Sequence, residues 1–149
     1  MATMTSDDPH NLGQARARHA WDLVGKVKDG PEFEKFERAA KKMPVRVMTA
    51  GLGHAMAFLE AKKEAPALVA AIGRRLEQRF PSQADGREAS PEKAAEVVME
   101  RIVNSDALFL RRATEEVLAY LQWVNRFAEA AKKEADARDG AAKGGRRDD

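Results

Sequence analysis

Apolar residues recur at steps of three and four along most of the chain, which predicts helices. The first helix is expected to start at Asp8-Pro9, a capping residue followed by a first-turn proline, and to end before Gly30. The apolar positions of this helix and the four that follow it are Leu12, Ala20, Leu23, Val24 and Val27; Phe33, Phe36 and Ala40; Val45, Met48, Leu52, Ala55 and Leu59; Leu68, Val69, Ile72, Leu76 and Phe80; and Val97, Val98, Ile102 and Val103. No run alternates with a period of two, so the predicted fold is all-α, a single-domain bundle of about five to seven helices.

The last helix has the longest apolar pattern. It is expected to run from Asp106 into the 130s, with Ser105 as its capping residue. One face carries Ala107, Leu110, Thr114, Val117, Leu121, Val124, Ala128 and Ala131, and an adjoining face carries Phe109, Tyr120, Trp123 and Phe127. A helix that is apolar on two adjoining faces is central to its bundle or also meets a second chain.

Polar segments set the expected domain boundaries. Residues 1–7 are expected to be a disordered N-terminus, and residues 8–135 the helical bundle. The stretch 81–90 is rich in helix breakers and predicts a loop. Residues 136–149 are expected to form a charged, disordered tail.

The stretch around Pro44 raises the question of a phosphate-binding loop. Pro44 is expected to break or kink the chain, and the apolar spacing after it places Gly51 and Gly53 inside a helix. A dinucleotide fingerprint would need glycine where Met56 stands and a preceding strand, and a triphosphate loop would need Gly-Lys followed by Ser or Thr. Each glycine inside a helix costs roughly 1 kcal/mol relative to alanine. We therefore interpret the pair as a site where another helix packs closely.

Composition narrows the classes of function. The 149 residues are 34% charged and 44% hydrophobic, contain no cysteine and carry a net charge of +2. Disulfides, thiolate metal sites and cysteine nucleophiles are thereby excluded. No basic start is followed by an apolar run, and no segment has the roughly 18 apolar residues of a membrane span. We expect a cytoplasmic protein without a membrane partner.

The sequence offers little for catalysis. His10, His19 and His54 lack metal-ligand spacing, and His54 is expected to be a satisfied interior or edge residue. Glu115 and Glu116 follow two arginines by four residues, which predicts ordinary ion pairs on a solvated face. We predict no enzyme activity, no cofactor and no metal.

Basic residues gather in clusters that can neutralise backbone phosphates, although a solvated helix surface explains them as well. They are Lys41, Lys42 and Arg46; Arg74, Arg75 and Arg79; Arg111 and Arg112; and Arg126. The aromatic residues Phe58, Phe109, Trp123 and Phe127 are expected in the core, which argues against base stacking on them.

Two segments together carry a family resemblance. KKMPVRVMTAGLGHAMAFLEAKK, residues 41–63, and FLRRATEEVLAYLQWVNRFAEA, residues 109–130, resemble the small α-helical subunit family of the type III-B CRISPR Cmr complex. The first segment leads from lysines through Pro44 to Gly51-Leu52 and Ala57-Phe58-Leu59, and the second contains Ala113-Thr114, Trp123 and Arg126-Phe127-Ala128. QARARHAW, residues 14–21, resembles the first helix of the family more weakly. One departure is Ala50, where the family often has Asn.

The resemblance implies a non-catalytic part in an RNA-guided antiviral effector. In such complexes copies of the small subunit stack into an inner filament that helps to hold the duplex of guide RNA and single-stranded target RNA, beside other Cmr subunits. The predicted RNA-phosphate contacts are Lys41, Lys42, Arg46, Arg111, Arg112 and Arg126. Two alternatives stay open: a homo-oligomeric helical scaffold or adaptor without nucleic acid, and an enzyme of unrecognised type.

Overall fold

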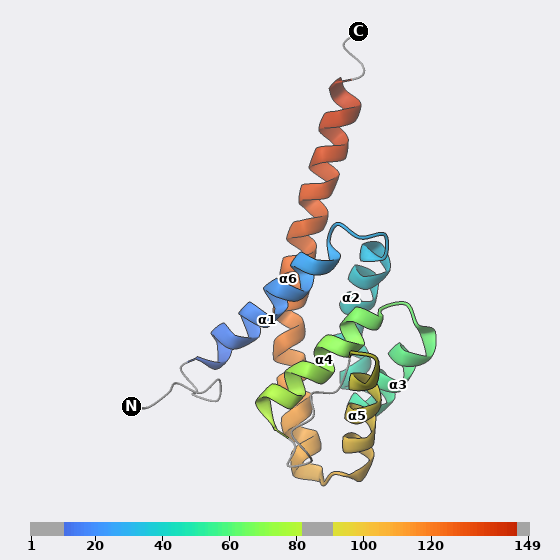
Figure 1. The fold of residues 1–149 in the computed structure, drawn as a ribbon, viewed down its shortest axis with the longest axis vertical. Coiled ribbons are helices and arrows are strands. Elements are labelled where there is room, and N and C mark those ends of the chain that lie inside the picture. The colour runs from blue at the N-terminus through green and yellow to red at the C-terminus, as the bar shows by residue number, and fades with distance from the viewer. Residues whose placement is uncertain (1–10, 82–90, 146–149) are drawn as a thin grey trace.

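The computed structural model describes residues 11–81 and 91–145, and within them the fold is all-helical (Figure 1). The helices are α1 (Leu12–Val27), α2 (Phe33–Ala50), α3 (Leu52–Lys62), α4 (Pro66–Arg79), α5 (Pro91–Asn104) and α6 (Ala107–Gly145). The described residues form one bundle without strands, so the predicted all-α, single-domain class is confirmed.

The long helix α6 is the central element of the bundle. It packs against α1, α2, α3 and α4, and its residues Val117, Leu121 and Val124 are almost fully buried. The predicted apolar face of the last helix therefore lines the core from Leu110 onward, whereas Ala107 is exposed. Figure 1 shows the C-terminal part of α6 projecting beyond the other helices.

Pro44 was expected to break or kink the chain, and the break is wrong: α2 continues through Pro44. A proline inside a helix has no N–H for the carbonyl four residues earlier, here that of Ala40. The side chain of Asn125 in α6 supplies the missing donor, with Nδ2 2.9 Å from the Ala40 oxygen. This contact with α6 thus gives the Ala40 carbonyl the hydrogen bond that the proline cannot donate.

The break between α2 and α3 lies at Gly51. Its φ of 90° and ψ of 158° belong to a region that glycine alone adopts readily, so the prediction that Gly51 lies inside a helix is wrong. Gly53 does lie in α3, and a Cβ placed there would be 3.3 Å from Cγ2 of Ile102 in α5. The close-packing interpretation is confirmed for Gly53 only.

Several residues of the predicted apolar faces are exposed to solvent. Val45, Met48, Val97 and Val103 lie on the exposed sides of α2 and α5, and Val103 is 74% exposed. Phe58 and Trp123 are also exposed, whereas Phe109 and Phe127 pack against the core.

The start and end of α6 also differ from the prediction. Asp106, not Ser105, caps the helix, since its Oδ1 accepts a hydrogen bond from the N–H of Phe109 at 2.8 Å. The hydroxyl of Ser105 bonds to the carbonyl of Ile102 instead. The helix extends to Gly145, so residues 136–145, assigned to a disordered tail, are helical. The predicted N-terminal segment 1–7, the Asp8-Pro9 start, loop residues 82–90 and residues 146–149 lie outside the described residues.

Candidate nucleic-acid interface

The six cations predicted to contact RNA lie on two helices. Lys41, Lys42 and Arg46 belong to α2, and Arg111, Arg112 and Arg126 belong to α6. Among the described residues, no ion pair, hydrogen bond or ring contact joins the two groups. The structure therefore presents them as separate basic surfaces on neighbouring helices.

The α2 group is largely engaged with the protein itself. Lys41 lies 3.1 Å from a carboxylate oxygen of Glu37, whose side chain is only 8% exposed. The guanidinium of Arg46 lies 3.8 Å from the centre of the Phe58 ring, a cation–π contact between α2 and α3. Lys42 is exposed and, within the described chain, has no ion-pair partner.

The α6 group is more available. Arg111 is 80% exposed and lies 3.8 Å from Glu115, the predicted i, i+4 pair. Arg112 and Arg126 are also exposed, and neither has an ion-pair partner in the described residues. They lie fourteen residues apart on nearly the same side of the helix, a separation of about 21 Å along the axis. Two exposed arginines in this arrangement can contact backbone phosphates, but contacts of this kind do not read the identity of the bases.

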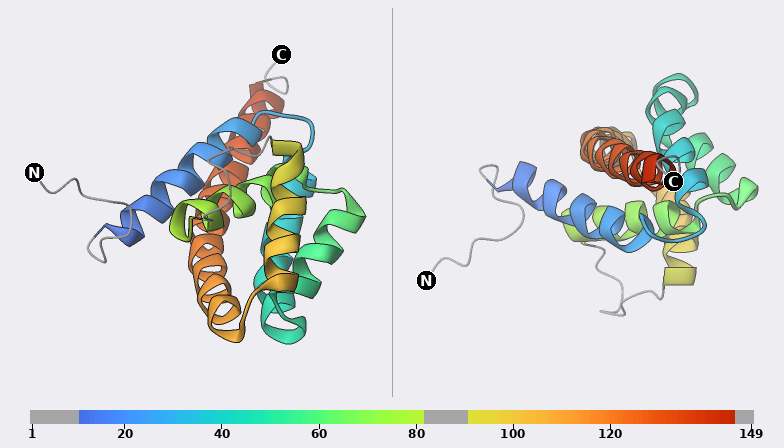
Figure 2. Two further views of the ribbon diagram at one scale, coloured as in Figure 1. Left: turned by 60° about the horizontal axis from the view of Figure 1, so that its bottom comes forward. Right: turned by 90° about the horizontal axis from the view of Figure 1, so that it is seen from above.

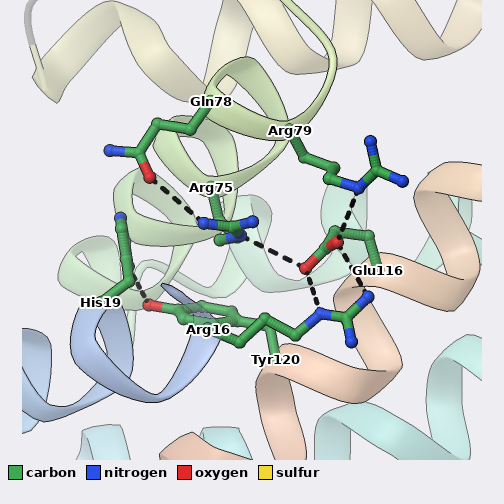
Figure 3. Close-up of polar contacts among 7 residues, drawn as sticks. All are labelled: Arg16, His19, Arg75, Gln78, Arg79, Glu116 and Tyr120. Carbon is green, nitrogen blue, oxygen red and sulfur yellow. Dashed lines mark hydrogen bonds and ion pairs between the residues drawn. The ribbon is translucent and has the colours of Figure 1, made fainter. Parts of the chain in front are cut away.

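The cluster of Arg74, Arg75 and Arg79 is not the phosphate-binding surface that charge alone allowed. Only Arg74 is exposed, whereas the side chain of Arg75 is 1% exposed. Arg75 and Arg79 point inward to the carboxylate of Glu116, at 3.2 Å and 3.5 Å (Figure 3). These two arginines are engaged in ion pairs that link α4 to α6.

Glu116 is the centre of a buried ion-pair cluster, so its prediction as a solvated residue is wrong. Its side chain is 1% exposed, and Arg16 of α1 binds both carboxylate oxygens at 2.7 and 3.0 Å. A carboxylate that is removed from water needs such charge-assisted hydrogen bonds to offset desolvation. Glu116 therefore links α1, α4 and α6 at one point. Its spacing from Ala113 and Tyr120, three and four residues away, is the signal that could have placed it on the core side.

A second polar contact lies beside this cluster. Nδ1 of His19 and the hydroxyl oxygen of Tyr120 are 2.7 Å apart (Figure 3). Burial, with Arg75 and Arg74 next in importance, lowers the pKa of His19 to about 4. Burial also raises the pKa of Tyr120. At neutral pH both groups are therefore uncharged, and they join α1 to α6.

The described residues hold no group of three or more His, Asp or Glu side chains arranged to bind a metal ion. His54 is exposed and has no interior role. None of the described helices combines the length and apolar character needed to cross a membrane.

Comparisons with known proteins identify the family. The model of the family described as CRISPR-associated protein (Cas_Cmr5) matches residues 12–131. A crystal structure of a CRISPR-associated Cmr5 family protein from Thermus thermophilus is similar, with a TM-score of 0.65 and 28% identity over 80% of this chain and 98% of that one. No curated protein sequence matches.

The family match covers both segments on which the resemblance rests, residues 41–63 and 109–130. The match also spans α1 to α5 and most of α6. The predicted relation to the small α-helical subunits of the type III-B Cmr complex is confirmed, and this chain belongs to the Cas_Cmr5 family of CRISPR-associated proteins.

Proposed function

We propose that this chain is the non-catalytic small subunit of a Cmr-type antiviral effector, in which its copies stack into an inner filament and help to hold the guide RNA–target RNA duplex. The observation that carries the proposal is the family match over residues 12–131. The paired and buried carboxylates and the inward-facing His19 are consistent with a structural part and not with acid–base chemistry.

The row on α6 is the stronger of the two candidate RNA surfaces. Arg112 and Arg126 are exposed and free of carboxylate partners in the described chain, and Arg111 has only an exposed, solvent-screened pair. Replacing such a pair by a phosphate contact costs little. Lys41 and Arg46 would have to give up contacts with Glu37 and Phe58, which makes the α2 group the weaker candidate.

The first test is a pull-down of the tagged full chain from its native cell at low salt, with sequencing of the copurified RNA. Short guide RNAs with a constant repeat-derived end, together with larger partner subunits, are expected. A preparation free of RNA and of partner subunits would contradict the proposal and favour the homo-oligomeric scaffold.

The second test measures phosphate contacts. We would follow binding of a guide–target RNA duplex to the assembled complex over a range of salt concentrations, with Arg112→Ala and Arg126→Ala compared with Arg138→Ala. Removing a true phosphate contact should lower the salt slope by about one unit and should weaken binding to all RNA sequences equally. Arg138, on the projecting part of α6 and 3.7 Å from Glu134, should leave the slope unchanged. An unchanged slope in either test variant would reject that arginine.

A further inference from the structure

Aromatic side chains gather on the surface where α1 packs across α6 (Figure 1). Trp21 of α1 is 64% exposed and Trp123 of α6 is 39% exposed, large values for aromatic side chains. Both indoles contact Phe127, which packs against the core. The centre of the Phe127 ring is 5.2 Å from that of Trp21 and 5.7 Å from that of Trp123. We call these three residues the aromatic site.

The aromatic site holds its rings in place before any ligand arrives. Phe127 is fixed by the core, and its ring plane meets that of Trp123 at 31° and that of Trp21 at 85°. The two indoles are therefore steeply inclined to each other, so a flat ring can stack on only one of them at a time. An indole that is 64% exposed, like that of Trp21, has at least one open face. Stacking on such ordered rings costs little conformational entropy.

Each indole has an exposed arginine three residues away on its own helix. Arg18 precedes Trp21 on α1, and Arg126 follows Trp123 on α6. This spacing makes the two side chains neighbours on the helix surface, about 4.5 Å apart along the axis. Within the described residues neither arginine has an ion-pair partner. The adjacent Asp22 lies about 100° round α1 from Trp21. The aromatic site is therefore flanked by available positive charge from both helices (Figure 2 shows the two helices from other sides).

The arginine row of α6 continues this surface. Arg112 precedes Trp123 by eleven residues, which places both on nearly the same side of α6, about 17 Å apart along its axis. The residue between them on this side is the small, half-buried Ala119. Proteins that bind single-stranded nucleic acid combine cations that contact the phosphates with aromatic rings on which the bases stack. The exposed Trp123 thus adds to the row the aromatic group that arginines alone do not supply.

We propose that the aromatic site stacks an unpaired base of single-stranded RNA, while the phosphates on either side of that base contact Arg18 and Arg126. The inference rests on the proposed function and adds to it the group that the surface takes. In a duplex the faces of the bases are covered by their neighbours, so a base that stacks on an indole comes from RNA outside the paired region. Because every base has a π face, the site holds RNA without selecting a sequence.

The experiment uses the indoles as reporters, because Trp21 and Trp123 are the only tryptophans in the sequence. Their indole N–H signals are followed by heteronuclear NMR on the purified full chain at low salt, as a single-stranded oligoadenylate of about eight nucleotides is added to about 1 mM. Both signals are expected to shift, because the ring current of a stacked base reaches both indoles. A strand of the same length and charge without bases, and a fully paired duplex, should each shift them clearly less.

Variants separate stacking from contact with apolar carbon. Trp21→Leu and Trp123→Leu keep an apolar side chain but remove the π surface, and each should weaken binding of the adenylate about fivefold or more, as read from the remaining indole. Trp21→Phe and Trp123→Phe should retain most of the affinity. A matched control, Val103→Ala, shortens a 74% exposed apolar side chain on α5 and should bind the adenylate like the unaltered chain. Circular dichroism verifies that every variant is folded.

Three outcomes would overturn the stacking site: indole signals that the adenylate leaves in place, a strand without bases that shifts them equally, or leucine variants that bind the adenylate like the unaltered chain. The first would leave the aromatic site to a protein partner, and the second would mean contact with phosphates alone. Failure of the proposed function is seen separately, in a pull-down without guide RNA and partner subunits. A chain that copurifies with guide RNA but fails the NMR test would refute the stacking site only.

Discussion

Glu116→Ala tests the buried cluster most directly. The substitution removes the carboxylate that Arg16 of α1 shares with Arg75 and Arg79 of α4. Arg75 then keeps its charge in a site where its side chain is 1% exposed, and in the described part of the chain Gln78 is the hydrogen-bond partner that it retains. Nη2 of Arg75 already has no hydrogen-bond partner among the described residues, so the variant leaves a buried cation still less satisfied.

The expected loss is about 3–5 kcal/mol of unfolding free energy, the usual cost of removing one partner from a buried ion pair. Arg16 and Arg79 contribute less to that loss, because their side chains are 21% and 29% exposed and can turn towards water. Total stabilities of domains are about 5–15 kcal/mol, so the variant is expected to lose a large share of its stability.

Urea unfolding followed by far-ultraviolet circular dichroism measures the effect. With a denaturant slope of about 1–3 kcal/mol per molar, the midpoint should fall by about 2 M. Glu115→Ala is the matched control on the same helix: Glu115 is 69% exposed and pairs with the exposed Arg111, so the loss should stay below about 1 kcal/mol.

A rescue variant separates charge from packing. Glu116→Leu combined with Arg75→Met replaces the most buried ion pair by apolar groups of similar size and should recover at least half of the loss. Equal midpoints for Glu116→Ala and Glu115→Ala would refute the reasoning, because they would mean that Glu116 is not desolvated.

Three further predictions concern single contacts. The pKa of His19 is about 4 in the folded chain and 6.5 in the unfolded chain, so the unfolded chain binds more protons between these pH values. Stability should therefore fall as the pH drops from 6.5 to 4, by about 1–2 kcal/mol once the full shift is discounted for the partly exposed ring. A His19→Asn variant whose stability, measured by urea titration, falls as steeply with acid would contradict this. Gly51→Ala should cost about 1–3 kcal/mol of stability, because the φ of Gly51 is 90°. The control Gly25→Ala, in α1 with no atom near the added Cβ, should be neutral or stabilising. Equal melting temperatures of the two variants would disprove the positive φ of Gly51. Asn125→Leu should cost about 1–3 kcal/mol, because it leaves the buried carbonyl of Ala40 without a donor; a chemical-denaturation midpoint equal to that of the unaltered chain would show that the bond is dispensable.

The sequence was sufficient for the class, the family and much of the core. The three-and-four spacing of Val117, Leu121 and Val124 identified the central helix, because burial on one side of a helix has a period that can be read directly. The family could be predicted because the order of two separated segments is itself sequence information.

Only the tertiary structure decided what the charged and exceptional residues do. The same Glu-after-Arg spacing describes Glu115 and Glu116, yet one is solvated and the other is the buried partner of three arginines from α1 and α4. Pro44 continues a helix because Asn125, 81 positions later, satisfies the open carbonyl. Likewise, Val45 and Val103 match the apolar period but lie outside, since helix period tells how residues group on one helix and not how many neighbours cover it. Local sequence encodes conformation and periodicity, whereas desolvation and pairing depend on which distant segments meet.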